Sequence, residues 1–137
     1  MNIARAVERA ARHVPRQTAI LFEDRQVGYL ELNRAANRTA HGLAAWGVGA
    51  GDRVALFLPN VPAFAVAYQA VLKLGAIAVS VNVMLTTEEL AALLDDSGAR
   101  VVFTVGGLWP RLAPLAGGVL RRDRVVICEG EVDGLPT

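Results

Sequence analysis

The pattern of hydrophobic and polar positions begins with an amphipathic helix. Apolar residues recur at helical spacing over residues 3–14, while arginines and a glutamate occupy the opposite face. Asn2 can accept a hydrogen bond from the first turn, and Pro15 ends the pattern, because the residue before a proline avoids the helical conformation. The sequence therefore predicts a first helix with one buried face.

A hairpin and a longer helix follow. Residues 18–22 predict a short strand, residues 23–26 a polar turn, and residues 27–29 the returning strand. The next helix has one apolar face and ends at Gly47, before a glycine-rich connection at 47–52. The apolar positions of this helix are Leu32, Ala36, Ala40 and Leu43.

After the glycine-rich connection the pattern changes to short, continuous apolar runs, which are typical of strands buried on both faces. We expect these buried strands at residues 53–58, 76–81, 100–105 and 124–128. The first two runs are separated by a helix that is apolar nearly all round and extends to about Leu74. Asn60 is its expected cap, and Pro62 lies in its first turn, where a missing N–H costs little.

The helix before the third run has the clearest end signals in the chain. Thr86 and Glu89 fit a capping box, and Gly98 follows the last apolar position. By contrast, Pro110 and Pro114 limit the next connection to a turn or two of helix.

Strands that alternate with connections of helical length predict right-handed crossovers and a parallel sheet. We therefore expect an α/β fold, a mainly parallel sheet with flanking helices. Residues 1–128 are expected to form this domain, and residues 129–137 a linker or a truncated edge.

Composition narrows the classes of function. Fourteen basic and 13 acidic residues give a formal net charge of +1, and the arginines are scattered along the sequence among acids, so we expect no nucleic-acid partner. Cys128 is the only cysteine, which excludes an intrachain disulfide and fits a reducing compartment. No uninterrupted apolar run approaches the length of a membrane span. We expect a cytoplasmic protein without such a span.

Local motifs supply neither a catalytic nor a metal site. The glycines of 47–51 come after a helix and before a strand, the reverse of a dinucleotide-binding loop. The glycine pair 106–107 follows a strand but lacks the Lys-Ser/Thr pair of a P-loop. His13 and His41 have no second ligand at a metal-binding spacing, and Ser80 lacks the glycines of a nucleophile elbow. The residues alone predict an α/β domain without catalytic or metal-binding residues.

A series of short motifs, in order, carries more information than any one of them. The motifs are Tyr29-Leu30-Glu31-Leu32, Gly51-Asp52-Arg53-Val54-Ala55, Leu58-Pro59-Asn60, Lys73-Leu74-Gly75-Ala76, Asn82 and Asp96-Ser97-Gly98-Ala99. Together they resemble the N-terminal portion of the adenylate-forming (AMP-binding) superfamily. Residues 79–85 look most like fatty-acid or related carboxylate–CoA ligases.

The resemblance implies an activity for a larger enzyme. Members of the superfamily convert a carboxylate and ATP, with magnesium, into an acyl-adenylate, and the CoA ligases pass the acyl group to CoA. Their phosphate-binding loop, magnesium-associated acid and lid lysine lie beyond the region that this chain resembles. The resemblance therefore implies an inactive N-terminal scaffold fragment that needs no cofactor itself, whereas the full enzyme uses ATP, Mg and CoA.

The same resemblance implies a partner and one region of interest. The partner is the rest of the parent enzyme, and an exposed apolar surface is expected to cause self-association. In some CoA ligases a basic residue just after the residue that matches Asn82 meets the CoA phosphates, but here Val83 or Met84 stands at that position. We therefore expect Asn82 and Met84 only to neighbour the route of CoA.

Two alternatives keep the same fold. The chain can act as a stand-alone, non-catalytic binding or interaction module. It can also act as a nucleotide-binding regulator that uses the ends of its parallel strands.

Overall fold

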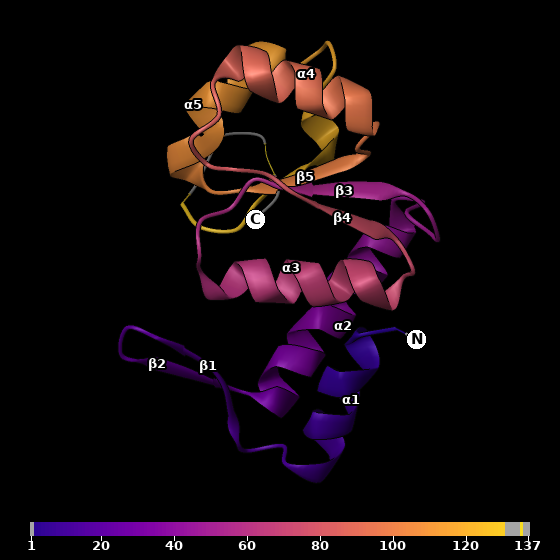
Figure 1. Ribbon diagram of the computed structural model, residues 1–137, viewed down its shortest axis with the longest axis vertical. Helices are drawn as coiled ribbons and strands as arrows, with labels where there is room; N and C mark the ends of the chain where they lie inside the picture. Colours follow the sequence, from indigo (N-terminus) through magenta and orange to yellow (C-terminus); the bar gives the residue numbers. More distant parts are fainter. Residues whose placement is uncertain (1, 131–134, 136–137) are drawn as a thin grey trace. The chain divides into compact units, whose positions relative to one another are not determined.

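The computed structural model describes residues 2–130 and 135 (Figure 1). The chain divides into two compact units. We call Met1–Gly51 with Asn60–Ile77 the helical unit, and Asp52–Pro59 with Ala78–Thr137 the sheet unit. Most of the linker or truncated edge expected at 129–137 lies outside the described residues.

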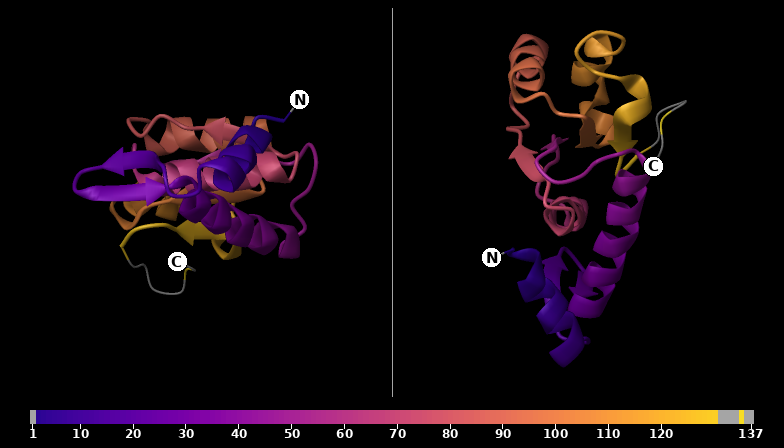
Figure 2. Two further views of the ribbon diagram at one scale, coloured as in Figure 1. Left: turned by 90° about the horizontal axis from the view of Figure 1, so that it is seen from below. Right: turned by 90° about the vertical axis from the view of Figure 1, so that its right-hand side faces the viewer.

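The helical unit contains three helices and a hairpin. Its elements are α1 (Ala4–His13), β1 (Thr18–Phe22), β2 (Arg25–Gly28), α2 (Tyr29–Ala45) and α3 (Pro62–Lys73). Helix α2 packs against both α1 and α3, and α1 and α2 lie side by side (Figures 1 and 2). The predicted apolar face of α2 is buried as expected, which places its residues in the centre of this unit.

The starts of α1 and α2 are satisfied in different ways. The Asn2 side chain accepts a hydrogen bond from the amide of Ala4 at 2.9 Å, but the N-cap residue of α1 is Ile3, one position after the predicted cap. Helix α2 has no side-chain cap. The amide of its first residue donates to the carbonyl of Gln17 at 3.0 Å, and the amide of Leu30 donates to the carbonyl of Pro15 at 3.1 Å. The segment before the hairpin therefore caps α2 with main-chain oxygens.

The hairpin turn is shorter than the sequence predicts. Strands β1 and β2 are antiparallel, and Phe22 pairs with Arg25, so only Glu23 and Asp24 form the turn. Glu23 adopts a positive φ of 52°, in the left-handed region that a two-residue turn requires. Arg25 and Gln26, expected in the turn, therefore lie in β2, where both residues are exposed.

The predicted cap of α3 is wrong. Helix α3 begins at Pro62, and its N-cap residue is Val61, which has extended angles (φ −118°, ψ 161°) and makes no side-chain cap. A proline forces the preceding residue into this conformation, so Val61 rather than Asn60 becomes the boundary. The end of the helix at Lys73 agrees with the expectation.

The sheet unit contains four strands in the order β4-β3-β5-β6. Its elements are β3 (Arg53–Leu56), β4 (Ile77–Ser80, whose first residue belongs to the helical unit), α4 (Thr87–Ser97), β5 (Val101–Thr104), α5 (Trp109–Leu112) and β6 (Val125–Ile127), with short 3₁₀ turns at Gly106–Leu108, Ala113–Leu115 and Arg122–Arg124. Strand β5 pairs in parallel with β3 and with β6. Helices α4 and α5 lie on one side of the sheet (Figure 1). The expected α/β fold with a parallel sheet and flanking helices is confirmed.

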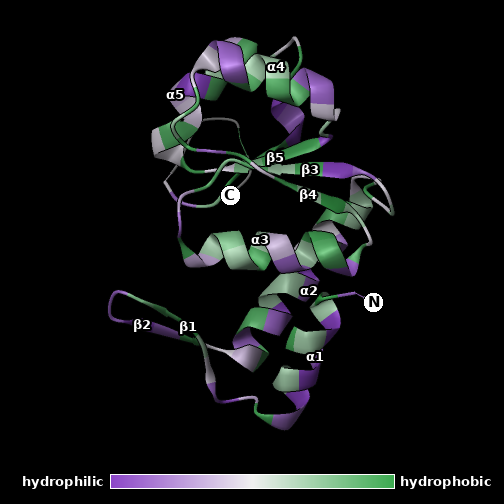
Figure 3. Ribbon diagram, viewed as in Figure 1, coloured by the Kyte–Doolittle hydropathy of each residue, from purple (hydrophilic) through white to green (hydrophobic). Residues whose placement is uncertain are grey.

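The core of this unit joins the strands to α4 and α5. Phe57, Leu90 and Leu112 are fully buried in one apolar cluster that also contains Val102 and Val125. In Figure 3, α4 shows hydrophobic and hydrophilic stretches in alternation, as an amphipathic helix does. The sheet unit therefore has a hydrophobic core of its own.

One predicted strand is less buried than its pattern suggests. Ala76 to Val81 reads as a strand buried on both faces, but in β4 Ile77 is 48% exposed and Ser80 is also exposed. The strand lies at the edge of the sheet, where only one side has a neighbouring strand. An apolar run alone cannot distinguish an edge strand from a central one.

Both predicted ends of α4 are confirmed. The amide of Glu89 donates to Thr86 Oγ1 at 3.3 Å, and the amide of Thr86 donates to the Glu89 carboxylate at 2.8 Å. Gly98 follows the helix with a φ of 63°, in the left-handed region that favours glycine. In the described part of the chain, no helix has the length and apolar character needed to cross a membrane.

Candidate functional site

The carboxyl ends of the parallel strands form the candidate site in the sheet unit. In open α/β sheets, ligands bind outside these ends. Main-chain hydrogen bonds continue the sheet beyond the ends of β3 and β4. The amide of Phe57 donates to the carbonyl of Phe103 at 2.9 Å, and the amide of Val81 donates to the carbonyl of Leu56 at 3.1 Å. The loop after β4 therefore leaves the sheet at this edge.

The two residues expected near a CoA route lie together in this loop. Asn82 Oδ1 accepts a hydrogen bond from the amide of Met84 at 2.9 Å, and the carbonyl of Asn82 accepts one from the amide of Leu85 at 3.2 Å. The Asn82 side chain thus closes a local turn. The Met84 side chain is 79% exposed at the tip of that turn.

Arg111 holds the turn in place, a role that no sequence motif indicated. Its guanidinium donates to the carbonyl oxygens of Val83 and Leu85, the latter at 3.1 Å. The guanidinium also lies over the Phe57 ring, 5.8 Å from its centre. The carbonyl of Arg111 accepts a hydrogen bond from the hydroxyl of Thr87 at 2.9 Å. These partners are more than 20 residues away in sequence, so no local motif could reveal them.

In the part of the chain that the structure describes, no three or more His, Cys, Asp or Glu side chains gather where they could hold a metal ion. The amide of Gly106 donates to the carbonyl of Glu129 at 2.7 Å, and that of Gly51 to the carbonyl of Gly75 at 3.0 Å. These amides of the two glycine segments are therefore engaged by the chain itself and not directed at a phosphate.

Two other candidates also lack catalytic properties. Burial, and secondarily the charge of Glu129, raises the pKa of the Cys128 thiol to about 11, so this thiol is neutral near pH 7 and a poor nucleophile. The Lys73 ammonium, only 9% exposed as a side chain, donates to Glu8 and to Asn33, each at 2.8 Å. Lys73 is therefore part of the helix packing of the helical unit.

A parallel sheet with flanking helices and a loop at its carboxyl edge defines an α/β domain. A family model, that of AMP-binding enzymes, matches residues 7–133. The chain belongs to this family.

Curated relatives are CoA ligases with different acids. The chain is 34% identical over 111 residues to a 3-hydroxybenzoate--CoA/4-hydroxybenzoate--CoA ligase of Thauera aromatica, a match that covers 81% of this chain and 21% of the relative. It is 43% identical over 79 residues to the long-chain-fatty-acid--CoA ligase FadD13 of Mycobacterium tuberculosis, covering 58% of this chain and 16% of the relative. The chain therefore spans about a fifth of the length of such relatives or less.

Solved structures agree with this placement. The crystal structure of the anthranilate CoA ligase AuaEII in complex with anthranoyl-AMP is similar over all of this chain and 27% of that one, with a TM-score of 0.90 and 26% identity. The inhibitor-bound N-terminal domain of FACL13 from Mycobacterium tuberculosis is similar over 93% of this chain and 32% of that one, with a TM-score of 0.80 and 32% identity. The fold is that of the N-terminal domains of adenylate-forming enzymes.

Proposed function

We propose that this chain is the N-terminal scaffold of an ATP-dependent carboxylate–CoA ligase and has no ligase activity alone. The proposal rests on the family match over residues 7–133 and on the pairwise matches, which cover only 21% and 16% of the first two relatives. The cofactors ATP, Mg and CoA belong to the full enzyme.

The partner in this proposal is the remainder of the ligase polypeptide, and the location of the whole is the cytoplasm. The substrate is a carboxylic acid. Relatives named as CoA ligases for hydroxybenzoate, fatty acids and crotonobetaine/carnitine match this chain at similar identity. The scaffold therefore occurs in ligases for different acids. We therefore propose that the acid is selected by parts of the enzyme beyond this chain.

The first experiment measures ATP–pyrophosphate exchange by the pure 137-residue chain with a panel of fatty and aromatic acids. We expect no exchange above the blank, because the matches to this chain cover only 21% and 16% of the first two relatives. The full-length hydroxybenzoate ligase of Thauera aromatica serves as the positive control. Exchange by the isolated chain overturns the proposal of an inactive scaffold.

The second experiment tests the scaffold role directly with a chimaera. Residues 7–128 of this chain replace the matching segment of the Thauera aromatica ligase. We expect the chimaera to form hydroxybenzoyl-CoA and to keep the acid preference of the recipient. A folded but inactive chimaera, or one with a new acid preference, contradicts the proposal.

The same chimaera tests the expected route of CoA past the turn of Asn82 and Met84. Met84 is exposed and uncharged, so Met84→Arg places a guanidinium where it can meet a phosphate without disturbing the core. We expect the KM for CoA to fall several-fold, about 1 kcal/mol of added binding, with kcat nearly unchanged. Leu21→Arg, a matched exposed position on the hairpin, is the control. Equal KM values for CoA in the two variants would mean that the turn does not lie on the route of CoA.

We also propose that the isolated chain self-associates. Large apolar side chains, among them Ile3, Leu21 and Met84, are 63%, 71% and 79% exposed. Multi-angle light scattering over a range of concentrations is expected to give a mass above that of the 14.6 kDa monomer. A monomer mass at the highest concentration contradicts this.

A further inference from the structure

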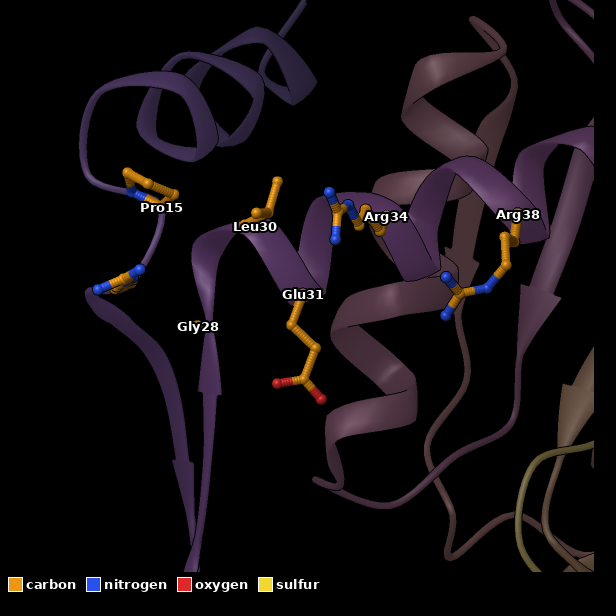
Figure 4. A pocket seen from close by; sticks show the side chains of 7 residues that line it. Pro15, Gly28, Leu30, Glu31, Arg34 and Arg38 are labelled. Carbon is orange, nitrogen blue, oxygen red and sulfur yellow. The ribbon is translucent and has the colours of Figure 1, made fainter.

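A hollow at the base of the hairpin in the helical unit gathers arginine side chains from separate segments. It has a volume of about 410 Å³, and its lining includes Arg16 before β1 and Arg34 and Arg38 on α2. Figure 4 shows the Arg34 and Arg38 side chains leaning back along α2 toward its first turn. These three arginines are separated in the sequence, but in the structure all three line one hollow.

These three guanidinium groups make no ion pair or hydrogen bond with the described residues. The acid that also lines the hollow, Glu31, pairs with Arg25 at 3.4 Å. Arg34 and Arg38 are one helical turn apart, where like charges repel. A ligand with negative charge can relieve this repulsion.

The first turn of α2 adds little attraction of its own. The amides of Tyr29 and Leu30 already donate to main-chain carbonyls of the preceding segment. Two amides at the start of α2 are therefore already engaged, whereas the three guanidinium groups have no such partner among the described residues. Guanidinium groups present paired N–H donors that match the oxygens of a phosphate.

The distribution of charge between the units supports the same conclusion. The helical unit has eight Lys and Arg against four Asp and Glu, and the sheet unit has six against nine. The chain's net charge of +1 thus hides an excess of positive charge in the unit that contains the hollow. Such an excess raises the local concentration of anions.

We propose that this hollow binds a polyphosphate group, with Arg16, Arg34 and Arg38 as its ligands. Three guanidinium groups suit a group with several charged oxygens better than a single carboxylate, because each can take its own oxygen pair. This site is separate from the proposed ligase function. Its failure leaves that function untouched.

The test uses inorganic pyrophosphate as the probe and the 137-residue chain at low ionic strength. Titration calorimetry is expected to show saturable binding, and two-dimensional amide NMR to show shifts concentrated at Gly28, Glu31 and Arg34. Raising the salt to about 0.2 M weakens the binding, since exposed charges are screened. Replacing pyrophosphate with acetate abolishes it.

A matched pair of double variants separates the hollow from general charge. Arg34→Gln with Arg38→Gln is expected to reduce the affinity at least about tenfold, because two charge-assisted contacts are lost. The control, Arg5→Gln with Arg9→Gln, removes two charges at the same spacing from α1, outside the hollow. It is expected to reduce the affinity for pyrophosphate less than about twofold. If the first variant does not fold, Arg16→Gln, which lies in no helix or strand, tests the same site.

Equal losses in both double variants overturn the proposal, since they mean that pyrophosphate responds only to net charge. An absence of saturable binding at low salt also overturns it. So do amide shifts located away from the hollow.

Discussion

The two units of this chain reach stability in different ways. Of the eleven largest fully buried side chains, only Val71 belongs to the helical unit, and the rest, such as Phe57 and Leu90, belong to the sheet unit. In the helical unit the fully buried positions are mostly alanines, such as Ala36 and Ala70. The sheet unit is stabilised mainly by large apolar side chains, and the helical unit by close approach of its helices.

The units also differ in how they bury charge. The helical unit places the Lys73 ammonium between Glu8 and Asn33, where it is nearly buried. In the sheet unit, the ion pair of Arg121 and Asp123 is exposed on both sides. A buried polar network helps to specify one packing arrangement in a unit whose apolar core is made of small residues. Exposed ion pairs add little to stability.

The largest expected effect is removal of a ring from the sheet unit. Phe57→Ala leaves a cavity in a fully buried position and is expected to cost about 3–5 kcal/mol in the free energy of unfolding. Phe64→Ala, in the helical unit, is expected to cost less, because Phe64 is only half-buried and stacks on Tyr68 at 6.3 Å. Urea denaturation measures both. Equal costs would break the comparison of the two cores.

The next effect tests the buried ion pair of the helical unit. Lys73→Met keeps the apolar stem but leaves Glu8 and Asn33 without their donor. Because the Glu8 side chain is about a third exposed, we expect a loss of about 1–2 kcal/mol and not the larger cost of a fully buried pair. Arg9→Met, on the exposed face of α1, is the control and is expected to change stability by less than about 0.5 kcal/mol. No difference between the two variants contradicts a stabilising network.

A smaller effect concerns the capping box of α4 in the sheet unit. Thr86→Ala removes the side-chain acceptor for the amide of Glu89 and is expected to cost about 1 kcal/mol. Thr86→Ser keeps this acceptor and restores most of the stability. Thermal unfolding with amide exchange in α4 measures the change. A Ser variant as unstable as the Ala variant shows that the methyl group, and not the cap, matters.

The smallest effect is a pH dependence in the helical unit. The hydrogen bond from Lys73 lowers the pKa of the Glu8 carboxyl below its ordinary value of 4.5, and the charges of Lys73, Arg12 and Arg5 act in the same direction. A lowered pKa in the folded state stabilises the fold above pH 4.5, and this contribution is lost as the pH falls through the folded pKa. Melting temperatures between pH 7 and pH 3 are expected to fall less for Glu8→Gln than for the parent chain. Parallel curves for the two proteins contradict this.

Local signals predicted the helices and most strands well. The spacing of Leu32, Ala36 and Ala40, and the Thr86–Glu89 capping box, specify their elements through contacts within a few residues. The edge position of β4 was not predictable in this way, because an apolar run does not reveal how many neighbouring strands it has.

The sites were less predictable than the fold. The turn of Asn82 and Met84 was found by resemblance, but Arg111, which fixes it, makes contacts across 26–28 residues of sequence. The hollow combines Arg16 with residues of α2, and this grouping depends on how the hairpin returns to the helix. Long-range geometry of this kind has no periodic signal in one sequence.

The main-chain cap of α2 has a consequence for how this region can evolve. Since carbonyls of Pro15 and Gln17 satisfy the helix start, the identity of the side chains there is largely free to drift. Gly28 is the fixed point, because a Cβ at this residue would lie 3.2 Å from the Pro15 carbonyl oxygen. Residues around the hollow can therefore be exchanged, and its ligand preference retuned, without loosening the helix that supports it.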